Sequence, residues 1–272
     1  MKLALLGRTL GHSLSPEVHA VLAELTGIPS SYELEETEPD RLEIKLQEMK
    51  EIYRGWNVTI PYKRDVIPWL DSLSPEAERL GAVNTVAVEN GHTRGYNTDM
   101  EGFRQALLHA GLMPEGRPCT VLGSGGAAEA VCACLKETGA GPVTVVSRNP
   151  SSVTGRIREH AGEKEMRIES YKELEEQGRG WLLINCTPVG MMPREGVSPV
   201  PESVTARFSA AADLIYNPSR TAFLKQAERL GLPVMNGMYM LAAQAAAARE
   251  IWTGRSAAPA LVEETLRRLG QS

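Results

Sequence analysis

A lysine and an aspartate among the first hundred residues have the side chains that acid–base chemistry requires. Lys63 ends the stretch "NVTIPYK" (57–63), and Asp99 ends the stretch "GYNTD" (95–99). Both stretches gather small polar groups where we expect the chain to change direction. A cation with a transferable proton, beside a carboxylate that orients it, forms an acid–base pair. The alternatives are an exposed surface lysine and an aspartate that only caps the helix after it.

The stretch "GHSLSPEVH" (11–19) points to a different chemistry, the binding of an anion. Ser13 and Ser15 come just before a predicted helix, so two hydroxyls and the positive end of a helix dipole converge there. Ser15 is also a residue type that caps helices, and this ordinary role is the alternative. Lys63 falls in the first turn of another predicted helix, where its positive charge is unfavourable beside the positive end of the helix dipole. This unfavourable position suggests that Lys63 has a functional role.

The stretch "GSGGAA" (123–128) matches the loop that wraps a dinucleotide pyrophosphate. Gly123 allows a tight turn, Gly125 lets the backbone approach the phosphates, and Ala128 lets helix and strand pack closely. The loop lies between an apolar stretch and an alanine-rich one, as a strand–loop–helix unit requires. The alternative is a tight strand–helix turn that binds nothing.

The end of the next predicted strand selects the form of the dinucleotide. Enzymes that use NAD usually place an acidic residue there, whereas this chain has Ser147, Arg148 and Asn149. A guanidinium offers a fixed charge and a planar set of donors that suit a 2′-phosphate. The sequence therefore predicts NADP, with an exposed loop cation as the alternative for Arg148.

The elements that position these residues alternate between strand and helix patterns. We predict strands at 2–7, 31–36 and 55–61, helices at 15–27, 39–52 and 74–81, and a hairpin over 84–97 that turns at Asn90-Gly91. A helix follows at 99–111, with a connector at 113–118. The main domain boundary is expected near residue 100, so that 1–100 form one domain and 101–236 another.

The second half repeats a strand–glycine loop–helix–strand order. Strands are predicted at 119–123, 142–148, 181–186, 211–216 and 232–235, and helices at 127–139, 238–252 and 258–270. Continuous apolar strands of this kind are typical of a parallel sheet that is covered on both faces. The fold class expected is therefore α/β in two domains.

Composition excludes several classes of function. The 272 residues are 42% hydrophobic and 23% charged with a net charge of −5, and they contain no long basic run, so nucleic-acid binding is not expected. No stretch is long and apolar enough for a membrane span. Four cysteines at this length predict buried thiols in a reducing cytoplasm, and Cys132-x-Cys134 is not expected to bind a metal.

Eight stretches, taken in this order, resemble the shikimate dehydrogenase family. They are "GHSLSPEVH", "NVTIPYK", "GAVNT", "GYNTD", "GSGGAA", "INCTPVGM", "DLIYNP" and "NGMYMLAAQ", and they extend over most of the chain. The resemblance implies a reversible, NADP-dependent reduction of 3-dehydroshikimate to shikimate in aromatic amino-acid biosynthesis. It also implies an N-terminal α/β substrate domain with a mostly parallel sheet, a Rossmann-like NADP domain, and an active site in the cleft between them. Residues 237–272 would return to the first domain, and the protein would be a monomer or a homodimer.

The resemblance also assigns roles to single residues. Lys63 and Asp99 would be catalytic, with the remaining substrate-binding set formed by Ser13, Ser15, Thr59, Asn84, Tyr216 and Gln244. The cofactor-binding set would be Gly123, Gly125, Gly126, Ala127, Arg148, Thr187 and Gly237. No metal is implied, and the partner is a small-molecule substrate.

The chain departs from the family pattern at three places. Thr9 stands where the first motif usually has proline, and Ala20 stands where it usually has asparagine. After Arg148 the family usually has a second cation three or four positions on, but this chain has Ser151 and Ser152 there. One cation therefore remains to select NADP.

Two other functions fit parts of this pattern. The first is a quinate/shikimate dehydrogenase that uses NAD or NADP, against which the two serines and Arg148 favour shikimate with NADP. The second is a nucleotide-responsive regulator without catalysis on the same fold. Such a regulator has no need for Lys63 and Asp99 together.

Overall fold

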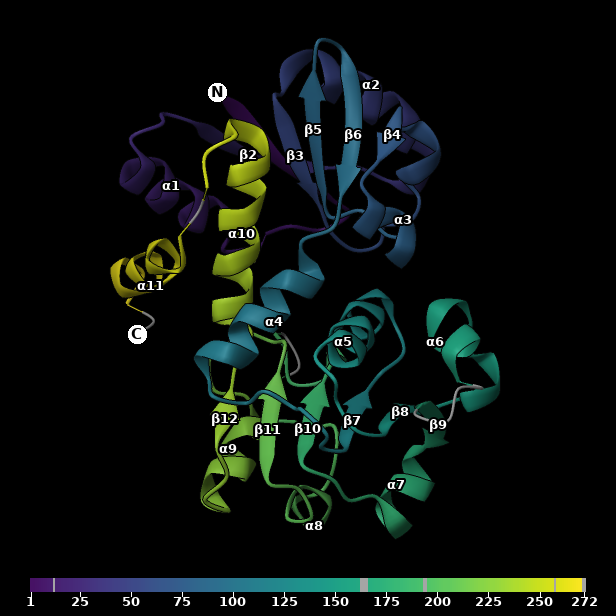
Figure 1. Cartoon of the computed structure of the whole chain (residues 1–272). Helices are drawn as coiled ribbons and strands as arrows, with labels where there is room; N and C mark the ends of the chain where they lie inside the picture. The colour runs from purple at the N-terminus through teal and green to yellow at the C-terminus, as the bar shows by residue number, and fades with distance from the viewer. Residues whose placement is uncertain (12, 162–165, 193–194, 257, 271–272) are drawn as a thin grey trace. The chain divides into compact units, whose positions relative to one another are not determined.

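The computed structural model describes residues 1–11, 13–161, 166–192, 195–256 and 258–270. The chain divides into two compact units, Met1–Gly102 with Leu241–Ser272, and Phe103–Met240. It leaves the first unit within helix α4 (Asp99–His109) and returns to it within helix α10 (Met238–Thr253) (Figure 1).

The first unit is built on a six-stranded mixed sheet in the order β2-β1-β3-β5-β6-β4. Its strands are β1 (Lys2–Gly7), β2 (Ser31–Glu36), β3 (Gly55–Val58), β4 (Ser72–Leu73), β5 (Thr85–Glu89) and β6 (His92–Tyr96). β1 runs parallel to β2 and β3, and β4 runs parallel to β6, whereas β5 is antiparallel to both neighbours. The predicted hairpin is confirmed, and Asn90 and Gly91 both have the positive φ that its two-residue turn requires.

Helices cover both faces of this sheet, which is why its central strands are apolar on both sides. The helical segments of this unit are α1 (Ser15–Thr26), η1 (Pro39–Arg41), α2 (Leu42–Ile52), η2 (Ile67–Trp69), α3 (Pro75–Leu80), α11 (Pro259–Arg268) and the C-terminal part of α10. Leu6 packs with Met49 of α2, while Leu3, on the opposite face, packs with Trp252 of α10. A Cβ on Gly55 would lie 2.2 Å from Trp252 Nε1, so this close approach requires glycine.

Two local predictions in this unit are wrong. Ser15 does not cap α1, because the helix begins at Ser15 itself, with Leu14 at the cap position and no capping side chain. Lys63 does not lie in a helix, because residues 60–66 form consecutive turns before η2. The physical reason is hydrogen bonding: the Lys63 carbonyl accepts the Val83 N–H, while the Ile67 N–H that a helix would direct to it donates to the Arg64 carbonyl. The predicted caps of α3 are confirmed, since Ser74 Oγ accepts the Ala77 N–H and Gly81 is left-handed.

The second unit contains a wholly parallel six-stranded sheet in the order β12-β11-β10-β7-β8-β9. Its strands are β7 (Cys119–Leu122), β8 (Val143–Ser147), β9 (Met166–Ser170), β10 (Leu182–Asn185), β11 (Ala210–Asp213) and β12 (Val234–Met235). This is the doubly wound, Rossmann-like arrangement that the sequence predicted. The strand β9 was not predicted, because its sequence MRIES contains no apolar run and only Met166 is buried.

Short helical segments complete the second unit: α5 (Gly126–Glu137), η3 (Pro150–Ser152), α6 (Gly155–His160), α7 (Tyr171–Gln177), α8 (Glu202–Thr205) and α9 (Ala222–Arg229). One face of the sheet packs against α7, α8 and α9 through an apolar cluster that includes Leu183, Phe208 and Phe223. Within the described ranges, no helix is both long and apolar enough to cross a membrane.

Each sheet has a position where its strand order reverses. In the first unit the chain goes from β1 outward to β2 and then back to β3, so the loops after β1 and β3 diverge at the carboxyl edge. In the second unit the same reversal lies between β7 and β10. Open α/β sheets bind ligands in the crevice at such positions. The two reversals therefore mark where functional side chains are expected.

Candidate active site

Lys63 and Asp99 form a close ion pair in the first unit. Lys63 Nζ lies 2.6 Å from Asp99 Oδ2, and the two side chains are 21% and 5% exposed. The turns after β3 carry Lys63, whose carbonyl accepts the Val83 N–H at 2.7 Å, and Asp99 begins α4. The lysine side chain is thus partly exposed, while its backbone is held by the segment that leads into β5.

Asn84 fixes the other oxygen of the same carboxylate. Its Nδ2 donates to Asp99 Oδ1 at 3.0 Å and to Thr98 Oγ1 at 2.9 Å. Its Oδ1 accepts the Thr98 N–H at 2.9 Å and the Thr85 hydroxyl at 3.0 Å, so the amide has one defined orientation. Both carboxylate oxygens of Asp99 therefore accept hydrogen bonds, Oδ2 from Lys63 and Oδ1 from Asn84.

Asn57 also belongs to the cluster, although our candidate set omitted it. Asn57 Nδ2 donates to the Asn84 carbonyl at 3.1 Å and to Thr85 Oγ1 at 3.0 Å, and its Oδ1 accepts the Tyr32 hydroxyl at 2.7 Å. The available signal was its place in "NVTIPYK", near the end of β3 and two residues before Thr59. The cross-strand contacts that involve it depend on β3 pairing with β5, which local patterns do not reveal.

His19 of α1 lies behind Asn57 and is almost wholly buried. Its ring stacks on Tyr32 with centroids 4.0 Å apart. Burial, and then the charge of Arg249, lower the pKa of His19 to about 3, although a hydrogen bond with Asn57 opposes the shift. His19 is therefore neutral at pH 7 and supports the cluster without carrying charge.

Ser13 and Ser15 follow β1, and Thr59 follows β3; among the hydrogen bonds of the described residues, none links these three to Lys63 or Asp99. Ser13 Oγ accepts the Ser15 N–H at 3.2 Å, and Glu36 holds their loop by accepting the Leu10 N–H at 2.6 Å. A Cβ on Gly7 would lie 2.7 Å from Thr59 Cγ2 and 2.5 Å from Leu10 Cδ2. Glycine at the end of β1 therefore lets the serine loop and Thr59 converge.

Gln244 lies half-buried in α10. Over the described ranges it makes no hydrogen bond with the Lys63–Asp99 pair. Hydrogen bonds thus connect Lys63, Asp99 and Asn84. Among the described residues, no hydrogen bond connects Gln244 to these three.

The glycine loop of the second unit has the features that a dinucleotide pyrophosphate requires. Helix α5 begins at Gly126, with Gly125 at its cap position and no side chain capping its N–H groups. A Cβ on Gly125 or Gly126 would meet nothing within 4 Å, so the space before the helix is open. Gly123 has a φ of +101°, which favours glycine. Open space and free N–H groups at a helix N-terminus fit a phosphate group.

The other predicted cofactor residues follow neighbouring strands of the same sheet. Thr187, after β10, brings its methyl group to 3.0 Å from the position of a Cβ on Gly123. Gly237 donates its N–H to the Ile215 carbonyl at 3.1 Å, so the segment that contains Tyr216 and the segment that contains Gly237 adjoin. Arg148 is exposed immediately after β8, and Ala127 lies in the first turn of α5.

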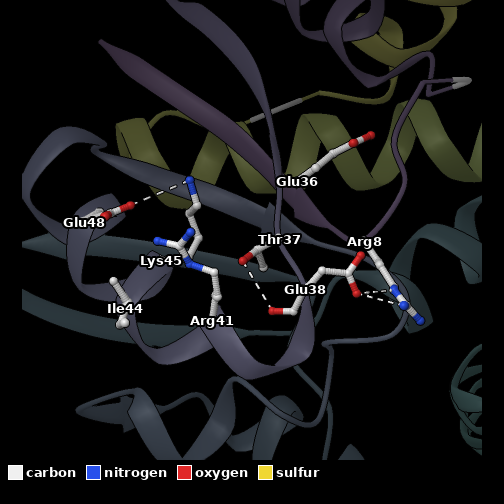
Figure 2. Close-up of a pocket in the computed structure, with 8 residues that line it drawn as sticks. All are labelled: Arg8, Glu36, Thr37, Glu38, Arg41, Ile44, Lys45 and Glu48. Atoms are coloured by element: carbon white, nitrogen blue, oxygen red, sulfur yellow. Dashed lines mark hydrogen bonds and ion pairs between the residues drawn. The ribbon is translucent and has the colours of Figure 1, made fainter.

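A hollow of about 320 Å³ in the first unit lies apart from these residues (Figure 2). It is lined by charged side chains from the ends of β1 and β2 and from α2, and most of them are paired. Arg8 lies 2.8 Å from Glu38, and Lys45 lies 3.0 Å from Glu35. None of the candidate site residues lines the hollow, and the described residues contain no cluster of metal-ligating side chains.

Comparisons with known proteins show the family to which the chain belongs. The model of the shikimate dehydrogenase substrate binding domain matches residues 5–86. The shikimate dehydrogenase (NADP(+)) of Clostridium perfringens is 40% identical over 256 residues, which cover 93% of each chain. The chain belongs to the shikimate dehydrogenase family. The resemblance that the sequence stretches indicated is therefore confirmed.

Solved structures extend this family likeness to the fold. A chorismate mutase/shikimate 5-dehydrogenase fusion protein from Clostridium acetobutylicum has a TM-score of 0.92 and 41% identity, covering 99% of this chain and 97% of that chain. The shikimate 5-dehydrogenase of Thermus thermophilus, in complex with NADP(H) and shikimate, has a TM-score of 0.86 and 39% identity, covering 98% and 99%. The two-domain α/β fold expected for a shikimate dehydrogenase is thus confirmed.

Proposed function

We propose that this shikimate dehydrogenase family member catalyses the reversible, NADP-dependent reduction of 3-dehydroshikimate to shikimate. The single observation that carries the proposal is the Lys63–Asp99 pair, 2.6 Å apart and oriented by Asn84. Relatives at 40% identity are named for this activity, and the Thermus thermophilus structure contains both NADP(H) and shikimate. Family and geometry therefore support the same reaction.

The proposed chemistry needs a proton donor beside the oxygen of the reacting carbonyl. When bound, the reduced nucleotide NADPH would supply the hydride for reduction, and the oxidised nucleotide would accept it in oxidation. In the direction of reduction, the Lys63 ammonium gives its proton to that oxygen and is reprotonated from solvent. In the direction of oxidation, the neutral amine takes the hydroxyl proton. Asp99 holds the amine and binds a ring hydroxyl.

The remaining candidate residues would bind the two small molecules. Ser13 and Ser15 would hold the substrate carboxylate, and Thr59, Asn84, Gln244 and Tyr216 would contact the ring and its hydroxyls. The glycine loop would hold the pyrophosphate, Arg148 the 2′-phosphate, and Thr187 and Gly237 the nicotinamide end. We therefore assign the substrate to the first unit, which contains the matched residues 5–86, and NADP to the second. Localisation in the cytoplasm and a monomeric or homodimeric state stay predictions of the sequence.

Initial rates decide between this function and its rivals. Purified protein is given shikimate or quinate with NADP or NAD, and formation of the reduced nucleotide is followed at its absorbance maximum. We expect the highest kcat/KM with shikimate and NADP. A preference for quinate with NAD overturns the substrate assignment. The absence of any turnover with all four pairs overturns the enzymatic function.

Removing the Arg148 guanidinium is expected to weaken selection of NADP. Arg148→Ala should raise KM for NADP by about 10- to 100-fold, because a hydrogen bond to a charged group contributes about 1.5–3 kcal/mol. KM for NAD, which lacks the 2′-phosphate, should change little. Steady-state kinetics with both nucleotides measure the effect.

Arg167 on β9 of the same unit is the matched control, since it is also an exposed arginine. Arg167→Ala should leave both constants unchanged. Equal increases for NADP and NAD in Arg148→Ala would contradict a role at the 2′-phosphate.

A further inference from the structure

A buried polar network lies beneath the segments of the second unit that carry Thr187 and Tyr216. Its centre is the pair Asn185 and Asp213, the last residues of the neighbouring parallel strands β10 and β11. Both residues are 0% exposed. Neither residue belongs to the candidate sets, and the proposed reaction does not use them directly.

Asp213 accepts three hydrogen bonds. Its Oδ1 accepts the Asn185 amide at 3.0 Å and the Ile215 N–H at 3.1 Å, and its Oδ2 accepts the Thr221 hydroxyl at 2.7 Å. No Lys or Arg of the described residues forms an ion pair with it. Burial raises the pKa of Asp213 to about 6, so the group is mostly ionised at pH 7. A buried carboxylate without a cation is costly, and apolar residues usually occupy such a position.

The carboxylate determines which way the Asn185 amide faces. An ionised carboxylate only accepts, so the Asn185 NH₂ group must point toward Asp213. The same NH₂ group also donates to the Val189 carbonyl at 3.2 Å. The amide oxygen is thereby left for Thr187, whose N–H and hydroxyl both donate to it, at 3.0 and 2.6 Å.

The network reaches two parts of the dinucleotide region. Thr187, held by Asn185, presents its methyl group to the Gly123 turn of the glycine loop. The Asn185 carbonyl accepts the Leu214 N–H at 3.0 Å, and Asp213 accepts that of Ile215, so the backbone before Tyr216 is fixed. Gly237 in turn bonds to the Ile215 carbonyl.

We propose that Asn185 and Asp213 are positioning residues that hold Thr187, the Gly123 turn and the backbone of residues 214–215 in the geometry that the dinucleotide requires. The inference rests on the proposed function, because it takes NADP as the ligand of the second unit. Small displacements of groups that orient a reactant lower rates by up to about 100-fold.

The test measures NADPH binding by nucleotide fluorescence, together with kcat, KM for NADP, KM for shikimate and the melting temperature. In Asn185→Ala and Asp213→Ala, we expect NADPH affinity and kcat/KM for NADP to fall by about 10- to 100-fold. KM for shikimate should change much less. Asp213→Asn should recover most of the loss, because its amide oxygen can accept from Asn185 and Ile215.

Two further variants separate positioning from simple loss of stability. Thr187→Val keeps the shape and the buried carboxylate but removes the hydroxyl, and it should weaken NADPH binding in a protein that melts near the parent temperature. Gln226 of α9 forms another buried contact of the same unit, 2.6 Å from Thr205 Oγ1. Gln226→Leu should lower the melting temperature without changing NADPH affinity.

The possible results distinguish a failure of this inference from a failure of the proposed function. If the parent protein binds no NADPH, both the proposed function and this inference are overturned. If the parent binds and turns over normally but Asn185→Ala and Thr187→Val bind NADPH with parental affinity, only the inference is overturned. A loss of affinity in Gln226→Leu equal to that in Asn185→Ala also overturns it, because the effect is then one of stability alone.

Discussion

Lys63→Ala is expected to lower kcat for shikimate oxidation by about 10²- to 10⁴-fold, with a much smaller change in KM. The reason is that the amine is proposed to act on the reacting oxygen, where it would contribute mainly to the transition state. Binding of shikimate depends mostly on other groups, so a kcat effect without a matching KM effect is the signature. Steady-state rates with saturating NADP measure both constants.

Lys45 provides a matched control in the same unit. Its side chain is 24% exposed and lies 3.0 Å from Glu35, so it resembles Lys63 in burial and in pairing with a carboxylate. Lys45→Ala should retain the parental kcat. A Lys63→Ala protein that keeps near-parental kcat would exclude Lys63 as the proton donor. Unchanged far-UV circular dichroism is required before either result is interpreted.

Substitution of Asp99 tests its two proposed roles, orientation of the Lys63 amine and binding of a substrate hydroxyl. Asp99→Asn keeps the size of the side chain but removes the charge that holds Lys63 Nζ. Its effect should be a lower kcat together with a higher KM for shikimate, because Asp99 is proposed both to orient the amine and to bind a hydroxyl. A change in kcat alone would leave the orienting role and remove the substrate contact.

Acid is expected to destabilise the protein through His19 by roughly 5 kcal/mol over the interval from pH 6.5 to about pH 3. The folded pKa of about 3 lies below the ordinary 6.5, so the unfolded chain binds a proton that the folded chain excludes. Stability is therefore complete above pH 6.5 and is lost as the pH falls toward 3. The cause is burial of the ring against Tyr32 and near Arg249.

Urea unfolding at pH 7.0, 6.0, 5.0 and 4.5 tests this expectation. His19→Phe keeps an aromatic ring on Tyr32 but cannot titrate, so its free energy of unfolding should fall less with acid than that of the parent. Asp213 changes the free energy of unfolding in the opposite direction as the pH falls, because its folded pKa of about 6 lies above the ordinary value of 3.8. It is present in both proteins, so the difference between them isolates His19.

Parallel pH curves for the parent and His19→Phe would mean that His19 takes up its proton as readily in the folded protein as in the unfolded chain.

Most local elements, and the family, could be predicted from the amino-acid sequence alone. The turn at Asn90-Gly91, the cap at Ser74 and the glycine at 123 follow from backbone conformations that only certain residue types adopt, so short patterns reveal them. The apolar strands around the glycine loop were likewise readable from periodicity. Lys63 was predicted in a helix from its neighbours in the chain alone, whereas its carbonyl accepts the N–H of Val83, a contact distant in the sequence.

Which of these residues come into contact could not be predicted, because it depends on the tertiary structure. Lys63 and Asp99 are 36 positions apart, and they pair because β3 lies between β1 and β5, an order that strand patterns do not contain. The same holds for Asn57 beside Asn84 and for Asn185 beside Asp213, where neighbouring strands bring polar residues to the same edge of a sheet. Such contacts depend on strand order and register, which are set by the packing of the whole sheet and not by neighbours in the chain.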